Sequence, residues 1–109
     1  MNLRISENQL RFRITQGETE LLKCDGSLSF ALNLGSQTAE YAISLADLEQ
    51  PLDLEVDKNA WKLLVDRKDF SQFIASLPSR EGIEQNISMN GTQLTLVLEV
   101  DVRRKRVVA

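Results

Sequence analysis

The chain has 109 residues with 13 Lys and Arg against 16 Asp and Glu, so its formal net charge is −3, and it contains no histidine and one cysteine. The missing histidine excludes Ser-His-Asp and Cys-His catalytic sites and histidine-containing zinc sites, while a single cysteine makes neither an all-cysteine zinc site nor an intramolecular disulfide. The free cysteine and the lack of a signal-peptide core predict a cytoplasmic protein, and no apolar run of about 18 residues predicts a membrane helix.

The N-terminal segment predicts two strands and a short helix. Apolar residues alternate with polar ones over residues 2–6 and again over residues 10–14, and the polar gap at Glu7-Asn8 predicts a hairpin. Thr15 and Glu18 have the spacing of a capping box, so we expect a helix over residues 19–24 that buries Leu21 and Leu22 and ends at Asp25-Gly26. In this reading Cys24 is a small core residue.

The middle of the chain predicts three strands and two helices. Alternation continues over residues 28–34 and 39–45, around a turn at Gly35-Ser36, and a further strand covers residues 52–56. Asp57 is expected to cap a helix in which Trp61 belongs to the core, with Leu64 and Val65 at helical spacing. A second helix, after a break at residues 66–69, is expected to bury the apolar positions Phe70, Phe73, Ile74 and Leu77 and to end at Pro78.

The last third predicts a hairpin around Asn90-Gly91, the strongest short hairpin-turn dipeptide. The complete order is ββ-α-ββ-β-αα-ββ, in which both halves place strands around a helix and so hint at an internal duplication. We therefore expect an α+β domain over residues 1–102, with a mainly antiparallel, curved sheet of about seven strands and two or three short helices packed on one face. A partial barrel is the alternative, and residues 103–109 form a basic tail.

A block of residues near the N-terminus resembles a known family. The block consists of Leu3-Arg4-Ile5, Asn8, Leu10–Gln16 and Glu18, with Gly26, Phe30, Tyr41-Ala42 and Trp61 at fitting distances. It is similar to a family of short bacterial proteins of unknown function with the pattern L-R-I-x-x-N-x-L-R-x-R-[LI]-[TS]-x-x-E. The match covers roughly half the chain, and residues 98–102 are similar to the family's final strand. The resemblance implies a cytoplasmic bacterial protein and supplies no activity.

Arginines on the predicted sheet are the first candidate site. Arg4, Arg11 and Arg13 are expected on one polar face, where guanidinium groups bind phosphate or carboxylate bidentately. The structural alternative is cross-strand pairing with carboxylates, for which the candidates are Asp53, Glu55, Glu99 and Asp101. The same four carboxylates are weak candidates for a Mg²⁺ or Ca²⁺ site, although no loop signature of such a site is present.

Two further features concern partners. The tail residues Arg103, Arg104, Lys105 and Arg106 could contact nucleic acid or acidic protein, but the acidic net charge and the lack of interleaved aromatic residues argue against nucleic-acid binding. Val97, on an otherwise polar strand face, marks a second buried surface or an edge that dimerises by strand addition.

With no catalytic constellation, the sequence favours a non-enzymatic binding or assembly module that acts through a protein partner or self-association and needs no cofactor. The alternative is a small-anion or phosphoryl-ligand binder, or a weak enzyme, that uses the arginine face.

Overall fold

The computed structural model describes residues 1–77 and 82–101. In chain order the elements are β1 (Asn2–Ser6), β2 (Gln9–Ile14), α1 (Gln16–Asp25), β3 (Ser27–Asn33), β4 (Thr38–Ala46), β5 (Leu52–Asp57), β6 (Ala60–Asp66), α2 (Arg67–Ala75), β7 (Ile83–Met89) and β8 (Thr92–Val100). The predicted α+β class is confirmed. No helix in the described ranges is long and apolar enough to cross a membrane.

The strands form two four-stranded sheets. Sheet A has the order β1-β2-β8-β7 and sheet B the order β3-β4-β6-β5. Each sheet consists of two antiparallel hairpins joined by a central parallel pair, β2 with β8 or β4 with β6. The prediction of one sheet of about seven strands was therefore wrong, although four of the six strand pairings are antiparallel. The parallel pairs join residues as distant as Leu10 and Leu96, and such pairing leaves no local signal in the sequence.

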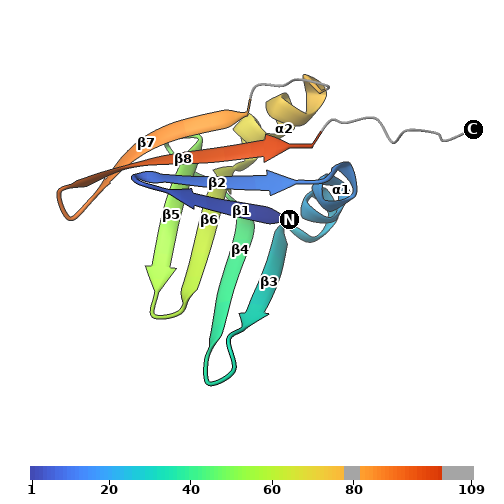
Figure 1. Cartoon of the computed structure of the whole chain (residues 1–109). Helices are drawn as coiled ribbons and strands as arrows, with labels where there is room; N and C mark the ends of the chain where they lie inside the picture. Colours follow the sequence, from blue (N-terminus) through green and yellow to red (C-terminus); the bar gives the residue numbers. More distant parts are fainter. Residues whose placement is uncertain (78–81, 102–109) are drawn as a thin grey trace, which may run out of the picture.

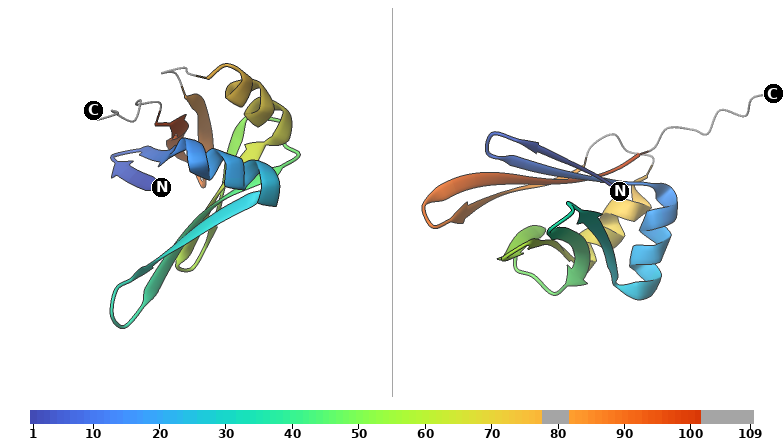
Figure 2. Two further views of the ribbon diagram at one scale, coloured as in Figure 1. Left: turned by 90° about the vertical axis from the view of Figure 1, so that its right-hand side faces the viewer. Right: turned by 60° about the horizontal axis from the view of Figure 1, so that its bottom comes forward.

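The two sheets pack face to face with their strands crossing (Figure 1). Both helices lie where the chain passes from one sheet to the other, after β2 and after β6, and both contact strand β4 of sheet B (Figure 2). The fully buried side chains of this core come from both sheets and both helices, and include Phe12, Ile14, Leu22, Ile43, Leu52, Leu63, Val65, Phe70, Leu96 and Leu98.

Residues 58–66 form a turn and the strand β6, not the predicted helix. Lys58 and Asn59 make a hairpin turn, and β6 pairs with β5 on one side and β4 on the other. Trp61, Leu64 and Val65 have the spacing of one helical face. However, Trp61, Leu63 and Val65 also recur at every second position, which is the period of a strand. Hydrogen bonding to the neighbouring strands β4 and β5 makes this segment a strand rather than a helix. The predicted second helix is present and buries Phe70 and Phe73, but it covers Arg67–Ala75, so it begins inside the predicted break at residues 66–69 and ends before Leu77. Asp57 caps no helix among the described residues.

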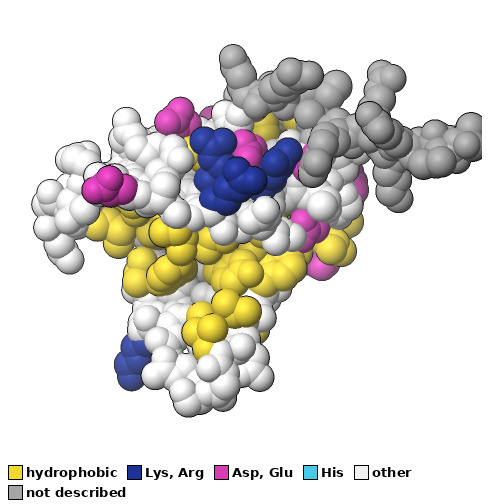
Figure 3. Space-filling model, viewed as in Figure 1, with side chains coloured by type: hydrophobic (Ala, Val, Ile, Leu, Met, Phe, Trp, Pro, Cys, Tyr) yellow, Lys and Arg dark blue, Asp and Glu magenta, His cyan; other side chains and the backbone are white. Residues whose placement is uncertain are grey.

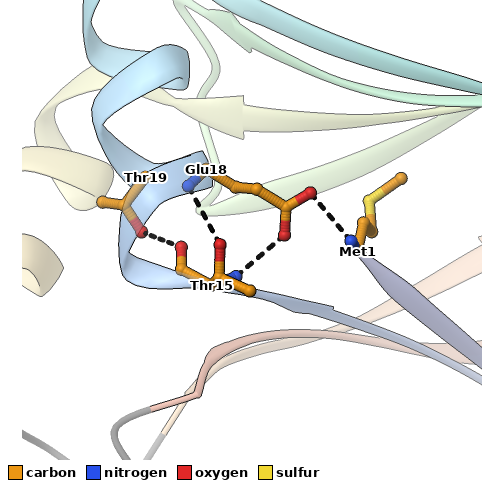
Figure 4. A network of polar contacts seen from close by, with 4 residues as sticks. All are labelled: Met1, Thr15, Glu18 and Thr19. Atoms are coloured by element: carbon orange, nitrogen blue, oxygen red, sulfur yellow. Dashed lines mark hydrogen bonds and ion pairs between the residues drawn. The ribbon is translucent and has the colours of Figure 1, made fainter. Parts of the chain in front are cut away.

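The α1 cap formed as predicted, and it includes the N-terminus (Figure 4). The Oγ1 atom of Thr15 accepts from the backbone N–H of Glu18 at 3.1 Å, and the Glu18 carboxylate accepts from the Thr15 N–H at 2.9 Å. The same carboxylate lies 2.7 Å from the Met1 ammonium group. Gly26 ends the helix with a φ of 76°, a left-handed conformation in which its N–H donates to Leu22.

The predictions that Leu21 and Cys24 of α1 belong to the core were wrong. Leu22 is fully buried, but Leu21 is half exposed and Cys24 is exposed. The helix is packed on one side only, so a single stripe that includes Leu22 enters the core. Leu21 and Cys24 lie off that stripe.

The hinted duplication is present in the topology. The unit β1-β2-α1-β3-β4 is followed by β5-β6-α2-β7-β8, and the pairing of Leu3 with Phe12 recurs 51 positions later as Leu54 with Leu63. The pairing of Phe30 with Tyr41 recurs 55 positions later as Gln85 with Leu96. Each unit contributes one hairpin to each sheet, so the two units are intertwined.

Candidate functional site

An apolar groove lies between the free edge of sheet A and the β3–β4 hairpin of sheet B. It has a volume of about 350 Å³, and we name it the β1–β3 groove. Its apolar lining consists of Leu3 and Ile5 from β1, Leu32 and Leu34 from the hairpin, and Ala39, Tyr41 and Trp61 from sheet B. Its polar rim consists of Gln37, Thr38, Glu40, Lys58 and Asn59.

Large apolar side chains are exposed around this groove. Ile5 is 61% exposed, Leu32 51% and Leu34 59%. Figure 3 shows hydrophobic side chains gathered below the edge of sheet A and continuing onto the β3–β4 hairpin. Scattered exposed leucines need no explanation, but a cluster in a concave region is typical of a binding surface.

The internal duplication provides a closed counterpart of the groove. The equivalent corner lies between β5 and β7, the other two edge strands, and these strands contact each other. Ile87, the counterpart of Leu32, is only 8% exposed, and Leu54, the counterpart of Leu3, is 9% exposed. Within the described ranges β1 and β3 make no contact of that extent. The same strand arrangement is therefore closed at the β5–β7 corner and open at the β1–β3 corner.

The floor of the groove differs from its counterpart in its side chains. Tyr41 and Trp61 are register partners in the central parallel pair of sheet B, and Phe30 stacks on Tyr41 with 6.0 Å between ring centroids. At the closed corner the positions equivalent to Tyr41 and Trp61 hold Leu96 and Leu10. Aromatic rings thus replace the aliphatic pair on the open side.

The three predicted arginines lie together on the outer face of sheet A. Arg11 Nη1 lies 3.1 Å from Glu99 Oε2, while Arg13 lies 4.0 Å from Glu99 and 3.5 Å from Asp101. Arg4 pairs with Arg11 in the strand register, is exposed, and makes no ion pair with any described residue. Basic side chains accordingly gather over the β1–β2 hairpin (Figure 3).

A shallow depression of about 330 Å³ adjoins this face. Arg4, Arg13 and Asp101 line it together with Met1, Asn2, Ile14 and Thr15. Among the described residues the buried Arg13 Nε atom has no hydrogen-bond partner, and a Glu99 carboxylate oxygen lies 4.0 Å from it. The arginines are thus close to a concavity, but two of the three already contact carboxylates.

The four predicted carboxylates do not converge. Asp53 and Glu55 lie on β5 in sheet B, whereas Glu99 lies near the end of β8 in sheet A and Asp101 directly follows that strand. In the part of the chain that the structure describes, no three His, Cys, Asp or Glu residues are grouped as a metal site requires. The tail residues Arg103–Arg106 lie outside the described residues.

Val97 is buried outside the main core, as its position on a polar face indicated. Its register partners are Arg11 and Glu84, whose long side chains flank it. The prediction of a pairing edge at Val97 was wrong, because β8 lies between β2 and β7. The edge strands of sheet A are β1 and β7.

Three carboxyl groups with shifted pKa values belong to the helix N-termini. Burial raises the pKa of Glu18, but the Met1 ammonium group and the Thr15 hydrogen bonds outweigh it and lower that pKa. The backbone N–H groups of Leu48 and Asp69 lower the pKa of Asp66, the N-cap of α2, while burial and the adjacent Asp66 raise the pKa of Asp69. These groups lie in the first turns of the helices and at the α2 N-cap, outside the groove.

The sequence did not identify the groove, because alternation assigned its residues to the core. Trp61 lines the groove from a strand, where a helical core position was expected. One signal was available, since apolar residues continue to the very tip of the hairpin at Leu32 and Leu34, beside Gly35.

Comparison with known proteins gives one result. The model of a family of unknown function (DUF7009) matches residues 1–104. No curated protein and no solved structure matches the chain.

Proposed function

The chain belongs to this family of unknown function, and we propose from its structure that it is a non-enzymatic binding module whose recognition surface is the β1–β3 groove. The ligand is an apolar segment of a protein partner. The observation that carries this proposal is the clustering of Ile5, Leu32 and Leu34, each more than half exposed, around one concavity.

The energetics support such a role. Burying a whole Leu or Ile side chain contributes about 1.5–3 kcal/mol, so burying the exposed parts of these three contributes roughly 3–5 kcal/mol. Micromolar binding requires about 8 kcal/mol after the costs of association. The groove lining alone therefore supports weak binding, and a tighter complex needs additional contacts with the aromatic floor and the strand edge.

A photo-cross-linking experiment tests the proposal. A photoreactive amino acid is placed at Leu34, and in a matched control at Lys62, which is exposed on the outer face of sheet B. We expect a cross-linked protein from Leu34 but not from Lys62. It counts as a partner only if, once purified, it shifts the fluorescence of Trp61, the single tryptophan, and loses binding to the Ile5→Asp variant. Equal cross-linking from both positions, or binding that Ile5→Asp leaves intact, would refute the proposal.

The second candidate function is anion binding by Arg4, Arg11 and Arg13. The depression lined by Arg4 and Arg13 favours this function. The carboxylates of Glu99 and Asp101, which pair with Arg11 and Arg13, compete with any added anion. Titration with inorganic phosphate, followed by the NMR signals of the guanidinium groups, tests this candidate. Saturable shifts that Arg4→Gln abolishes support it, and shifts that do not saturate refute it.

A further inference from the structure

The inference concerns how the β1–β3 groove recognises its partner, and it rests on the proposed function. Within the described part of the chain, β1 is an edge strand that pairs with β2 alone, across a two-residue turn at Glu7-Asn8. Ser6 and Gln9 flank this turn, where a hairpin forms its hydrogen-bonded pair. Because antiparallel pairs alternate, Leu3 and Ile5 direct their backbone N–H and C=O groups away from β2.

The same two residues line the groove. A strand added along β1 would hydrogen bond to the backbone of Leu3 and Ile5, and every second side chain of that strand would enter the groove beside theirs. At the closed corner β5 and β7 already cover the equivalent space. An added strand would therefore cover the apolar side chains of the β1–β3 corner, just as the chain itself covers the equivalent side chains at the β5–β7 corner.

The opposite face of the added strand would lie beside Arg4. Arg4 faces Arg11 across the β1–β2 ladder, which is an unfavourable pairing of like charges. Arg11 and Arg13 have carboxylate partners, whereas Arg4 has none among the described residues. An acidic side chain on the added strand would supply the missing charge.

We propose that the β1–β3 groove binds an extended segment of another protein by strand addition to β1, and that this segment alternates apolar residues with acidic ones. The apolar residues occupy the groove, and an acidic residue pairs with Arg4. A second copy of the chain fits less well, because antiparallel self-pairing of β1 with Leu3 opposite Ile5 sets two Arg4 side chains against each other.

Two blocked hexapeptides test the proposal, one alternating valine with glutamate and the other alternating valine with lysine. Binding to the full chain is followed by the fluorescence of Trp61 and by hydrogen exchange of the Leu3 and Ile5 amides. We expect the acidic peptide to bind roughly two- to fivefold more tightly per cross-strand pair formed and to slow exchange at both amides. We expect Arg4→Glu to reverse the preference, with Lys62→Glu, on the other sheet, as the matched control.

The outcomes separate this inference from the proposed function. If both peptides shift Trp61 equally and neither protects the β1 amides, strand addition is refuted while the groove remains a binding surface. If neither peptide nor any cross-linked partner reaches the groove, the proposed function fails as well. If light scattering shows a dimer that Ile5→Asp converts to a monomer, the occupant is a second copy and the proposal is overturned.

Discussion

Leu32 and Ile87 occupy equivalent positions in the two halves of the fold, and truncating each to alanine measures how open the groove is. Both substitutions remove similar aliphatic volume from strands with the same register. Ile87 is 8% exposed, so Ile87→Ala loses its transfer free energy and leaves a cavity, at a cost of about 2–4 kcal/mol. Leu32 is 51% exposed, so Leu32→Ala loses about half of a transfer free energy, roughly 1 kcal/mol, and leaves no enclosed cavity.

The assay is equilibrium unfolding in urea, supported by thermal melts. A difference of about 2 kcal/mol between the variants corresponds to roughly 10 °C in Tm for a domain of this size. The parent chain and Leu34→Ala serve as references, since Leu34 is also exposed in the groove. Equal destabilisation by Leu32→Ala and Ile87→Ala would refute the reasoning, because it would mean that the β1–β3 corner is as closed in solution as the β5–β7 corner.

Three further predictions concern the rest of the fold. Thr15→Ala removes the N-cap of α1 and is expected to cost about 1 kcal/mol in urea unfolding, whereas Gln16→Ala costs almost nothing; equal costs would contradict the cap. The lowered pKa of Glu18 gives stability that is fully present above the ordinary glutamate pKa and is lost as the pH falls through the folded-state value. Glu18→Gln should therefore flatten the acid side of the stability–pH profile, and an unchanged profile would exclude this contribution. Cys24 is exposed, so a thiol reagent should label it in the native chain at the rate seen in urea; a strongly slowed reaction would show that it is covered.

Local signals predicted the elements whose features are short-range. The two N-terminal strands, the α1 capping box and the Asn90-Gly91 turn all depend on residues within a few positions of each other, and all are present. Residues 58–66 were misread because their apolar positions satisfy both the helical and the strand period. Only pairing with β4 and β5 decides between them, and that pairing is not visible in the sequence. Propensity was overridden by tertiary structure.

The division into two sheets could not be predicted for the same reason. Alternation shows which residues share a face of a strand, but not which other strand covers that face. The arginine face follows from alternation alone and was placed correctly on one side of sheet A. The groove does not follow from alternation, because the same pattern that buries Leu54 and Ile87 leaves Leu3 half-buried and Leu32 exposed.

The open corner is a property of particular side chains, since the topology and register of the two corners agree. Where the closed corner has Leu10 and Leu96 side by side, the open one has Trp61 and Tyr41, with Phe30 stacked against Tyr41. Larger rings need more room between the sheets than leucines do, and interiors tolerate added volume poorly. Aromatic residues also bind partners well because they bury a large area at low conformational cost. The aromatic side chains that distinguish this corner from the closed one therefore form the floor of the proposed recognition surface.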